Sequence, residues 1–470
     1  MITRISHKKI IVIQTIDEIL LVVKELQARV AFLEGEIIIR DEKIKNLEQR
    51  LNLNSINSHT APSKDPVKIK ASKQRKKGGK KGGQNNHIGS TLYKSDFVDK
   101  VEQHIPEKCI CGKSLRSVKS TLDSTRQEFD IEINHKVTEH QRHSKICPCC
   151  QSINIAPYPE HIKSDTQYGP TIKAFSTLLN VDYKVPYEKV ANLIDTLFGL
   201  PISKGTVCNF IKKGFDSLEG FENEIKQALL DSKVVHADET GIVVDVALHW
   251  MHVLSTDKYT YLRVHQKRGS EAFDEIIKKY SGNLIHDFFK SYFSLTNSRH
   301  NPCGAHITRE LDALIDNKSK WATKFKHLYY ELFCQDHTYN VSIKEEIYKR
   351  YKTILRLGKK EEPEPIRTGQ RGQLKKSKGL NLIFRLETYM NEVLEFAFNT
   401  NIPFTNNQAE RDLRHSKIKL KVSGCFRSIK GAEYYARIMS VISTLKKQSY
   451  DVFQSLVTLF KYNNLTLLPE

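Results

Sequence analysis

One short stretch, KVVHADET (residues 233–240), sets the pattern for the central part of the chain. It begins as an apolar run with β-branched residues, which is typical of a strand, and it ends in two acids, Asp238 and Glu239. A buried strand seldom ends in carboxylates unless something nearby binds them. Because side chains alternate along a strand, the two acids face opposite ways, and only one of them can point into a given site.

Further strands follow this stretch. The expected elements are strands at HWMHVLST (249–256) and YTYLRVHQ (259–266), a helix at SEAFDEIIKKY (270–280) and a fourth strand at GNLIHDFF (282–289). The order βββαβ makes the first and fourth strands neighbours, so Asp238 and Asp287, expected at the two strand ends, lie close together. Taken singly, each aspartate also fits a cap at a strand end. Together they repel, and Mg²⁺, which prefers oxygen ligands, removes the repulsion.

The composition favours a polyanionic partner. The 470 residues are enough for about two to four domains, and they carry 74 basic and 54 acidic side chains, a net charge of +20. Nucleic acid fits this charge better than a membrane does, although a solvated basic surface also explains it. The apolar run IIVIQTIDEILLVV (10–23) is interrupted by Asp17 and Glu18 and lacks a small-residue cleavage site, so we expect neither a membrane span nor a signal peptide. The nine cysteines do not suggest a disulfide framework, which favours a cytoplasmic location.

Residues 10–52 are expected to form a coiled coil. Apolar residues recur there at alternating steps of three and four, with one gap at Arg40. Positions a are mainly β-branched and positions d mainly leucine, which favours a parallel homodimer. The alternative is one amphipathic helix packed on its own chain. The seam residues are Ile16, Ile19, Val23, Leu26, Val30, Leu33, Ile37, Ile44, Leu47 and Leu51.

A basic linker is expected in residues 53–98. It contains VKIKASKQRKKGGKKGGQNNHIGS, which holds Lys76, Lys77, Lys80 and Lys81 and no acid. Its glycines disfavour a helix, and a flexible basic arm can follow a phosphate backbone. A solubilising linker has the same composition.

Five cysteines fall within residues 99–160, which we expect to form a zinc-binding module. The motifs are CICG and CPCCQ, and two tight cysteine pairs separated in this way are typical of a structural zinc site. Buried free thiols are the alternative. The expected ligands are Cys109, Cys111, Cys147 and Cys150, and Cys149, His104 or His143 could substitute for one of them.

Residues 165–230 are expected to be helical. Within them, YEKVANLIDTLFGLPISKGTVCNFIKK predicts one helix that ends at Gly199 and a second capped by Ser203. This spacing suits a helix-turn-helix that reads DNA with Lys204, Thr206 and Asn209. Ordinary helix pairs share the pattern.

A third acid, Glu410, lies on a predicted helix near the C-terminus. Two local roles are open to it: a capping box with Asn407, or an ion pair with Arg414. The same helix is rich in cations, which suits an acid that binds a metal facing phosphates. These cations are Arg411, Arg414, Lys417, Lys419 and Lys421.

Segments along nearly the whole chain resemble the transposases of the insertion sequence 66 family, which are DDE transposases with a ribonuclease-H-like fold. The most specific segment is TNNQAERDLRHSKIKLKVSGCFRSIKGAEYYARIMSVISTLKKQSYDVF. The others are KKGGKKGGQNNHIGSTL, the cysteine pairs, YGPTIKAFSTLLNVDYKVPYEKV, HADETGIVVD, HWMHVLST, IHDFFKSY and CGAHITREL.

The resemblance implies a catalytic triad of Asp238, Asp287 and Glu410, which also binds the catalytic metal ions. It implies an α/β ribonuclease-H-like domain in residues 231–303 and 404–460, a helical insertion in residues 304–403, zinc at the cysteines, and DNA-end recognition by the N-terminal half. Cys303 and His306 match a Cys-x-x-His element found after the second aspartate in related enzymes. No metal is assigned to this pair.

Taken together, these features predict a DNA transposase of an insertion sequence that cleaves and joins strands with two Mg²⁺ or Mn²⁺ ions. We expect a nucleoid-associated homodimer that binds double-stranded DNA at transposon ends and target, with accessory proteins of the same element as potential partners. Two alternatives are a non-catalytic DNA-binding protein derived from a transposase, and a nuclease or resolvase that does not join strands. The expected DNA-binding residues are Lys76, Lys77, Lys80, Lys81, Arg411, Arg414, Lys417 and Arg427.

Overall fold

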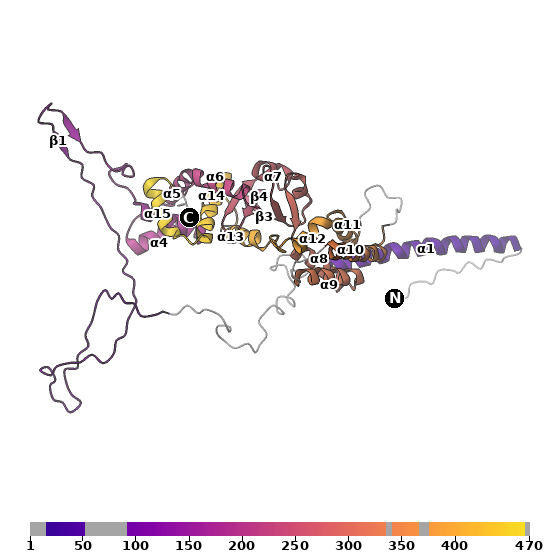
Figure 1. Cartoon of the computed structure of the whole chain (residues 1–470), viewed down its shortest axis with the longest axis horizontal. Helices are drawn as coiled ribbons and strands as arrows, with labels where there is room; N and C mark the ends of the chain where they lie inside the picture. The colour runs from indigo at the N-terminus through magenta and orange to yellow at the C-terminus, as the bar shows by residue number, and fades with distance from the viewer. Residues whose placement is uncertain (1–15, 52–91, 335–340, 366–375, 466–470) are drawn as a thin grey trace, which may run out of the picture.

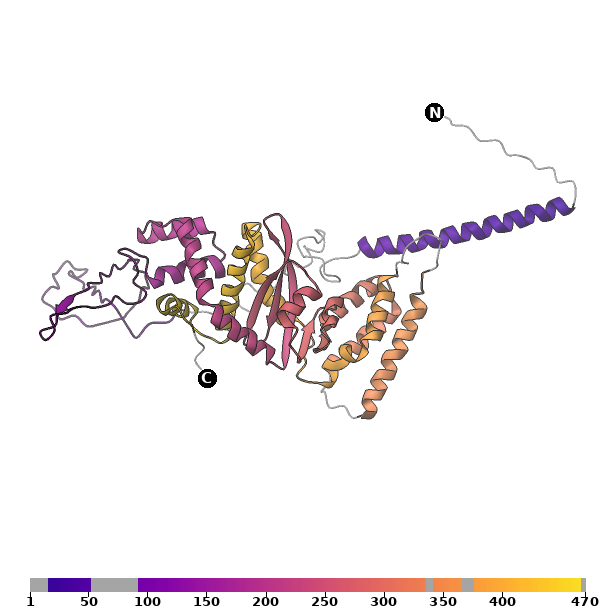
Figure 2. The same cartoon turned by 90° about the horizontal axis from the view of Figure 1, so that it is seen from above.

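The computed structural model describes residues 16–51, 92–334, 341–365 and 376–465. Figure 1 shows a central body of helices and strands, with one long helix, α1 (Ile16–Leu51), extending from one side and the strand β1 (Ser144–Ile146) lying at the other. The view from above in Figure 2 shows the same separation. The basic segment that contains Lys76, Lys77, Lys80 and Lys81 falls outside the described residues.

A five-stranded mixed sheet forms the centre of the body. Its order is β5-β4-β3-β6-β7, in which β3–β4 and β4–β5 are antiparallel pairs and β3–β6 and β6–β7 are parallel pairs. The prediction that the first and fourth strands are neighbours is therefore confirmed. The strands are β3 (Val234–Val244), β4 (Ala247–Ser255), β5 (Thr260–His265), β6 (Asn283–His286) and β7 (Arg299–Pro302).

The strand that carries Asp238 does not end there, so this part of the prediction is wrong. β3 continues to Val244 because GIVV keeps pairing with β4, with Asp238 opposite Val253. Its pairing with β6 is short and stops at His236. Asp238 therefore lies where β3 loses its parallel neighbour, and this leaves room for a side chain that follows β6.

Helices on the C-terminal side of the sequence pack against this sheet. α13 (Asn407–Ser423) contacts β3 and β4, while α14 (Ile429–Lys447) contacts β5 and α6 (Glu219–Leu230). α7 (Ser270–Ile277) connects β5 to β6. Nearly the whole middle of α14 is buried, so α14 forms the centre of the hydrophobic core shared by these elements.

The N-terminal helices of the body contribute to that core through residues such as Ala174 and Ile211, and they also form a smaller separate cluster with Val190, Ile194 and Val207. The predicted helix pair is confirmed as α4 (Tyr187–Phe198) and α5 (Lys204–Ser217): Gly199, at φ 62°, ends α4, and Ser203 Oγ accepts a hydrogen bond of 3.0 Å from the Thr206 amide. α3 (Pro170–Thr177) packs against α15 (Val452–Tyr462), close to the C-terminus. A π-helical turn, Leu178–Asp182, follows α3.

A second hydrophobic core lies in the helical segment between β7 and α13. Trp321, Phe325 and Tyr351 are fully buried in it. The segment is inserted after the strand that follows Asp287 and before the helix that carries Glu410, so it separates these acids in sequence. Its helices are α8 (Gly304–Asp316), α9 (Lys320–Cys334), α10 (Val341–Glu361), α11 (Lys378–Thr388) and α12 (Met390–Phe398).

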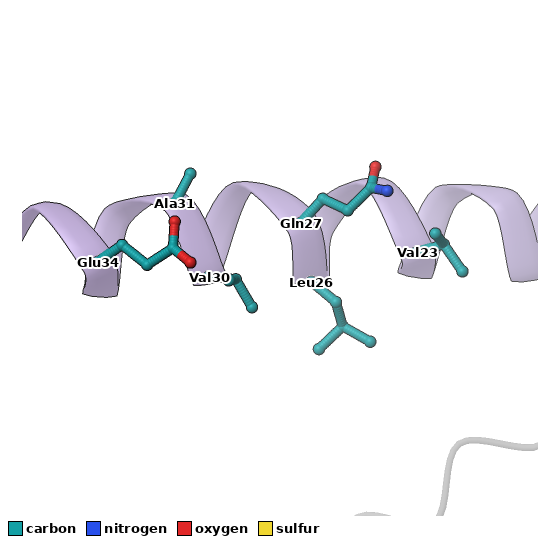
Figure 3. Close-up of a pocket in the computed structure, with 6 residues that line it drawn as sticks. All are labelled: Val23, Leu26, Gln27, Val30, Ala31 and Glu34. Carbon is teal, nitrogen blue, oxygen red and sulfur yellow. The ribbon is translucent and has the colours of Figure 1, made fainter.

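The N-terminal helix α1 has an exposed apolar stripe. Leu26 and Val30 are 59% and 52% exposed. Figure 3 shows both projecting from one side of the helix, whereas Gln27 and Ala31 project from the other. The stripe therefore does not pack on the described parts of its own chain. None of the helices in those parts has the length and hydrophobicity of a membrane span.

Candidate active site

Asp238 lies in the middle of β3 and is half-buried. Its Oδ1 accepts a hydrogen bond of 2.9 Å from the Glu239 amide. Burial raises the pKa of Asp238 to about 8, and the charges of Glu239 and Asp287 act in the same direction. The carboxyl group is therefore held in a site that opposes its ionisation unless a cation is present.

Asp287 directly follows β6. The turn that begins at Asp287 leads into a short 3-10 helix, Lys290–Ser294. Its Oδ1 accepts a hydrogen bond of 3.0 Å from the Phe289 amide, which fixes the turn. Because β6 is the parallel neighbour of β3, this turn lies beside Asp238. The two aspartates are close enough for the charge of Asp287 to raise the pKa of Asp238.

Glu239 faces away from Asp238 along the strand and is buried. Both of its oxygens hold protein donors: Arg268 Nε lies 2.8 Å from Oε1, and the Tyr292 hydroxyl lies 2.5 Å from Oε2. Burial and the charge of Asp287 raise the pKa of Glu239, whereas Tyr292 and Arg268 lower it. Both carboxylate oxygens of Glu239 therefore already have hydrogen-bond donors from the protein.

Glu410 lies in the first turn of α13, but not in the capping box considered above. The cap residue of α13 is Asn406 rather than Asn407, and its side chain makes no capping hydrogen bond. In the described residues the ion pair of Glu410 is with His306, whose Nε2 lies 3.6 Å from Oε1, rather than with Arg414. Oε1 is buried and accepts no hydrogen bond from that part of the chain.

Cys303, His306 and Glu410 form one compact group. Within the described residues, theirs are the ligand atoms that gather within 4.8 Å of one another. Cys303 caps α8, its Sγ accepts a hydrogen bond of 3.1 Å from the Asn406 amide, and burial raises its pKa. Asp238 and Asp287 are not part of this group. In the sequence, the three-residue spacing of Cys303 and His306 points to this pair, but nothing in the pattern links the pair to Glu410.

The sequence match follows the same segments. Residues 165–434, more than half of the chain, match the family model described as Transposase IS66 family. This chain belongs to that family. The resemblance seen in the sequence is thereby confirmed, and DNA is the partner of a transposase of an insertion element. A family of unknown function matches residues 12–92, and no curated protein matches the chain.

The cations of the transposase helix α13 divide into two sets. Arg411, Arg414 and Lys417 are exposed, and Lys417 lies close enough to Asp238 for its charge to lower the pKa of that carboxyl group. Lys419, which was not among the predicted DNA-binding residues, is buried instead. Its Nζ donates to the Asn180 carbonyl at 3.3 Å, and burial lowers its pKa to about 8. Arg427, in the turn after α13, is exposed.

The five clustered cysteines of residues 99–160 lie in two separate turns. In the first, the amide of Gly112, at φ 87°, donates to the Cys109 carbonyl at 2.8 Å; in the second, the amide of Gln151, at φ 59°, donates to the Cys147 carbonyl at 2.9 Å. The second turn joins β1 to β2 (Ile153–Ile155). Hydrogen bonds from Ser152, first through its hydroxyl, and from Cys147 lower the pKa of Cys150 to about 7. The four predicted ligands are not gathered into one group in the described residues.

Proposed function

We propose that the protein is a DDE transposase with a ribonuclease-H-like catalytic domain, which cleaves DNA at transposon ends and transfers the strand to target DNA. The observation that carries this proposal is the meeting of Asp238 and Asp287 from neighbouring parallel strands. The sheet order β5-β4-β3-β6-β7, with an antiparallel meander followed by parallel strands, supports the fold assignment. The third acid in this proposal, Glu410, lies in the first turn of α13, which follows the inserted helices in sequence.

The residues fit hard divalent cations. The charge of Asp287 opposes the ionisation of Asp238, and Glu410 Oε1 is a buried carboxylate oxygen that accepts no hydrogen bond in the described residues. A cation held by oxygen ligands relieves both costs. When bound, two Mg²⁺ or Mn²⁺ ions supply Lewis-acid chemistry at the scissile phosphate.

The protein side chains then have distinct roles in the proposed reaction. Asp238 and Asp287 hold the ions, while Glu410 completes the ligand set and accepts the proton of the attacking water. Hydrolysis yields a 5′-phosphate and a 3′-hydroxyl. In the second step this hydroxyl loses its proton and attacks a target phosphodiester, while the 3′-oxygen of the target strand leaves and takes up a proton. Exposed cations orient both DNA backbones beside the site. In this proposal they are Arg411, Arg414, Lys417 and Arg427.

The N-terminal half is proposed to recognise the DNA and pair two chains. The helix pair α4–α5, with Lys204 and Asn209 exposed, is the candidate reader of transposon ends. The cysteine turns are proposed to hold a structural zinc through Cys109, Cys111, Cys147 and Cys150. The exposed stripe of α1 is proposed to form the dimer, which would act in the cytoplasm on nucleoid DNA.

The test is an in vitro assay on a duplex that contains the element's end, with Mg²⁺. We expect nicking and strand-transfer products from the natural chain, none from D238N, D287N or E410Q, and unchanged DNA binding in all. D245N is the matched control, because Asp245 is exposed in the β3–β4 hairpin. Binding without nicking by the natural chain would favour the non-catalytic protein, and nicking without joined product would favour a nuclease or resolvase.

A further inference from the structure

Asn406 is fully buried beside the candidate site, at the start of α13. Its side chain does not cap its own helix but reaches β3. There Nδ2 donates to the Ala237 carbonyl at 2.7 Å, and Oδ1 lies 3.0 Å from His236 Nδ1. A side-chain cap is worth about 1 kcal/mol to a helix, so α13 forgoes this contribution in favour of a link to the strand.

The backbone of Asn406 extends the link to two more elements. Its amide donates to Cys303 Sγ at 3.1 Å, which joins it to the start of α8. Its carbonyl accepts from the Glu410 amide at 3.3 Å, within the first turn of α13. One buried residue therefore connects the position before Asp238, the position of Glu410 and the Cys303–His306 element.

An amide is required for this link. A carbonyl needs a donor and the imidazole Nδ1–H needs an acceptor, and asparagine supplies both from one short side chain. Aspartate keeps the acceptor and loses the donor, while alanine leaves two buried polar groups without partners at a cost of about 1–3 kcal/mol each.

A second residue in the first half of α13 anchors the helix independently. Asp412, two residues beyond Glu410, accepts hydrogen bonds from Ser255 Oγ at 2.5 Å, Thr260 Oγ1 at 3.0 Å and Lys447 Nζ at 2.7 Å. Asp412 fixes α13 to β4, β5 and α14, whereas Asn406 fixes it to β3. Of these two anchors, only Asn406 bonds directly to the strand segment next to Asp238.

We propose that Asn406 is a positioning residue that sets the distance between Asp238 and Glu410 and thereby the geometry of the metal site. This inference rests on the proposed function, in which both acids hold the same ions. Groups that orient metal ligands typically change metal affinity or activity by about 10–100-fold when removed. Mg²⁺ demands near-ideal octahedral geometry, so a displaced Glu410 lowers its binding most.

The variants are N406A and N406D, with N407A as the matched control. Asn407 is the adjacent residue, is exposed and makes none of these links. The readouts on the full chain are Mn²⁺ affinity by electron paramagnetic resonance, the single-turnover cleavage rate at saturating DNA, DNA affinity and the circular dichroism spectrum. We expect about 10–100-fold weaker Mn²⁺ binding and slower cleavage for both Asn406 variants, with unchanged DNA affinity. N407A should match the natural chain.

Wild-type Mn²⁺ affinity in a folded N406A or N406D overturns the inference. Loss of the folded spectrum in both variants also overturns it, because Asn406 would then serve folding alone. If only N406A unfolds, the Mn²⁺ affinity of N406D decides, because aspartate has nearly the same shape as asparagine. Failure of the proposed function gives a different pattern: the natural chain does not cleave, or D238N cleaves as fast as the natural chain, whatever Asn406 does.

Discussion

The Tyr292 hydroxyl donates a hydrogen bond of 2.5 Å to Oε2 of Glu239. Arg268 Nε donates to the other oxygen at 2.8 Å, and the Arg268 guanidinium lies over the Phe289 ring at 4.1 Å. Tyr292 and Phe289 both belong to the segment just after Asp287. Glu239 therefore ties that segment to β3, and its two oxygens are already used, which distinguishes it from Asp238.

We expect E239Q to cleave DNA at a rate within about tenfold of the natural chain, because Glu239 supports the site and does not hold the ions. Glutamine replaces one carboxylate oxygen with an amide donor and removes the charge that faces Arg268, so the folded state loses about 1 kcal/mol. Thermal melting and the cleavage assay measure both effects. Y292F removes one of the same bonds and is the control. A folded E239Q as inactive as D238N would identify Glu239 as a metal ligand.

The pH dependence of the stability of the metal-free protein should reflect the raised pKa of Asp238. Its pKa is about 8 in the folded chain and near the ordinary aspartate value of 3.8 when unfolded. Between these values the folded state binds the extra proton, so the free energy of unfolding falls as pH rises from about 4 to about 8. Asparagine at position 238 carries no charge, so the free energy of unfolding of D238N does not fall in this way.

We therefore expect metal-free D238N to melt above the natural chain at pH 8 and to match it near pH 4. Each kcal/mol corresponds to about 2–4 °C for a domain of this size. Adding Mg²⁺ at pH 8 should raise the melting temperature of the natural chain but not that of D238N. Equal melting of the two metal-free proteins at both pH values contradicts the assigned pKa.

The sheet is largely predictable from local pattern, because β3 to β6 are apolar runs that alternate or contain β-branched residues. β7 is not, since RHNP lacks this pattern and becomes a strand only by pairing with β6. The apparent end of the first strand at Asp238 has the same cause: its continuation is stabilised by β4, which lies later in the sequence.

The site is less predictable because its contacts join distant residues. The sequence pattern points to Asp238, Asp287 and Glu410 as the acids of the candidate site. It favours Asn407 as the cap of the last acid's helix, however, where the structure has Asn406. No local rule predicts that an asparagine bonds to β3 instead of its own helix. The same holds for His306, which meets Glu410 only because α8 and α13 start at the same place in space.

His306 is expected to orient Glu410, since its Nε2 lies 3.6 Å from Oε1. We expect H306A to slow cleavage by about 10–100-fold at saturating DNA and to leave DNA affinity unchanged. The matched control is H327A, because His327 is an exposed histidine in α9. Single-turnover cleavage and a DNA-binding titration separate the two effects. An H306A rate equal to that of H327A would show that Glu410 needs no support from the imidazole.

The zinc prediction concerns the two cysteine turns. We expect one zinc per chain in the purified protein, lost in C147S and in C109S and kept in C334S, whose cysteine is exposed in α9. Metal content by mass spectrometry gives the count. Because the pKa of Cys150 is lowered to about 7, zinc uptake should release fewer protons at pH 8 than at pH 6. Zinc retained by C147S would exclude it from the ligand set.

The apolar stripe of α1 is expected to be covered by a second copy of the helix. In the heptad, Leu26 occupies a d position and Ala28 the outward f position, and Leu26 is 59% exposed in the single chain. L26D removes an apolar contact from each chain and places two charges in the seam, which costs at least about 2–5 kcal/mol and should convert the dimer to monomer. A28D, on the same helix, should stay dimeric. Light scattering during size-exclusion chromatography gives the mass, and a monomeric natural chain or a dimeric L26D contradicts the coiled-coil assignment.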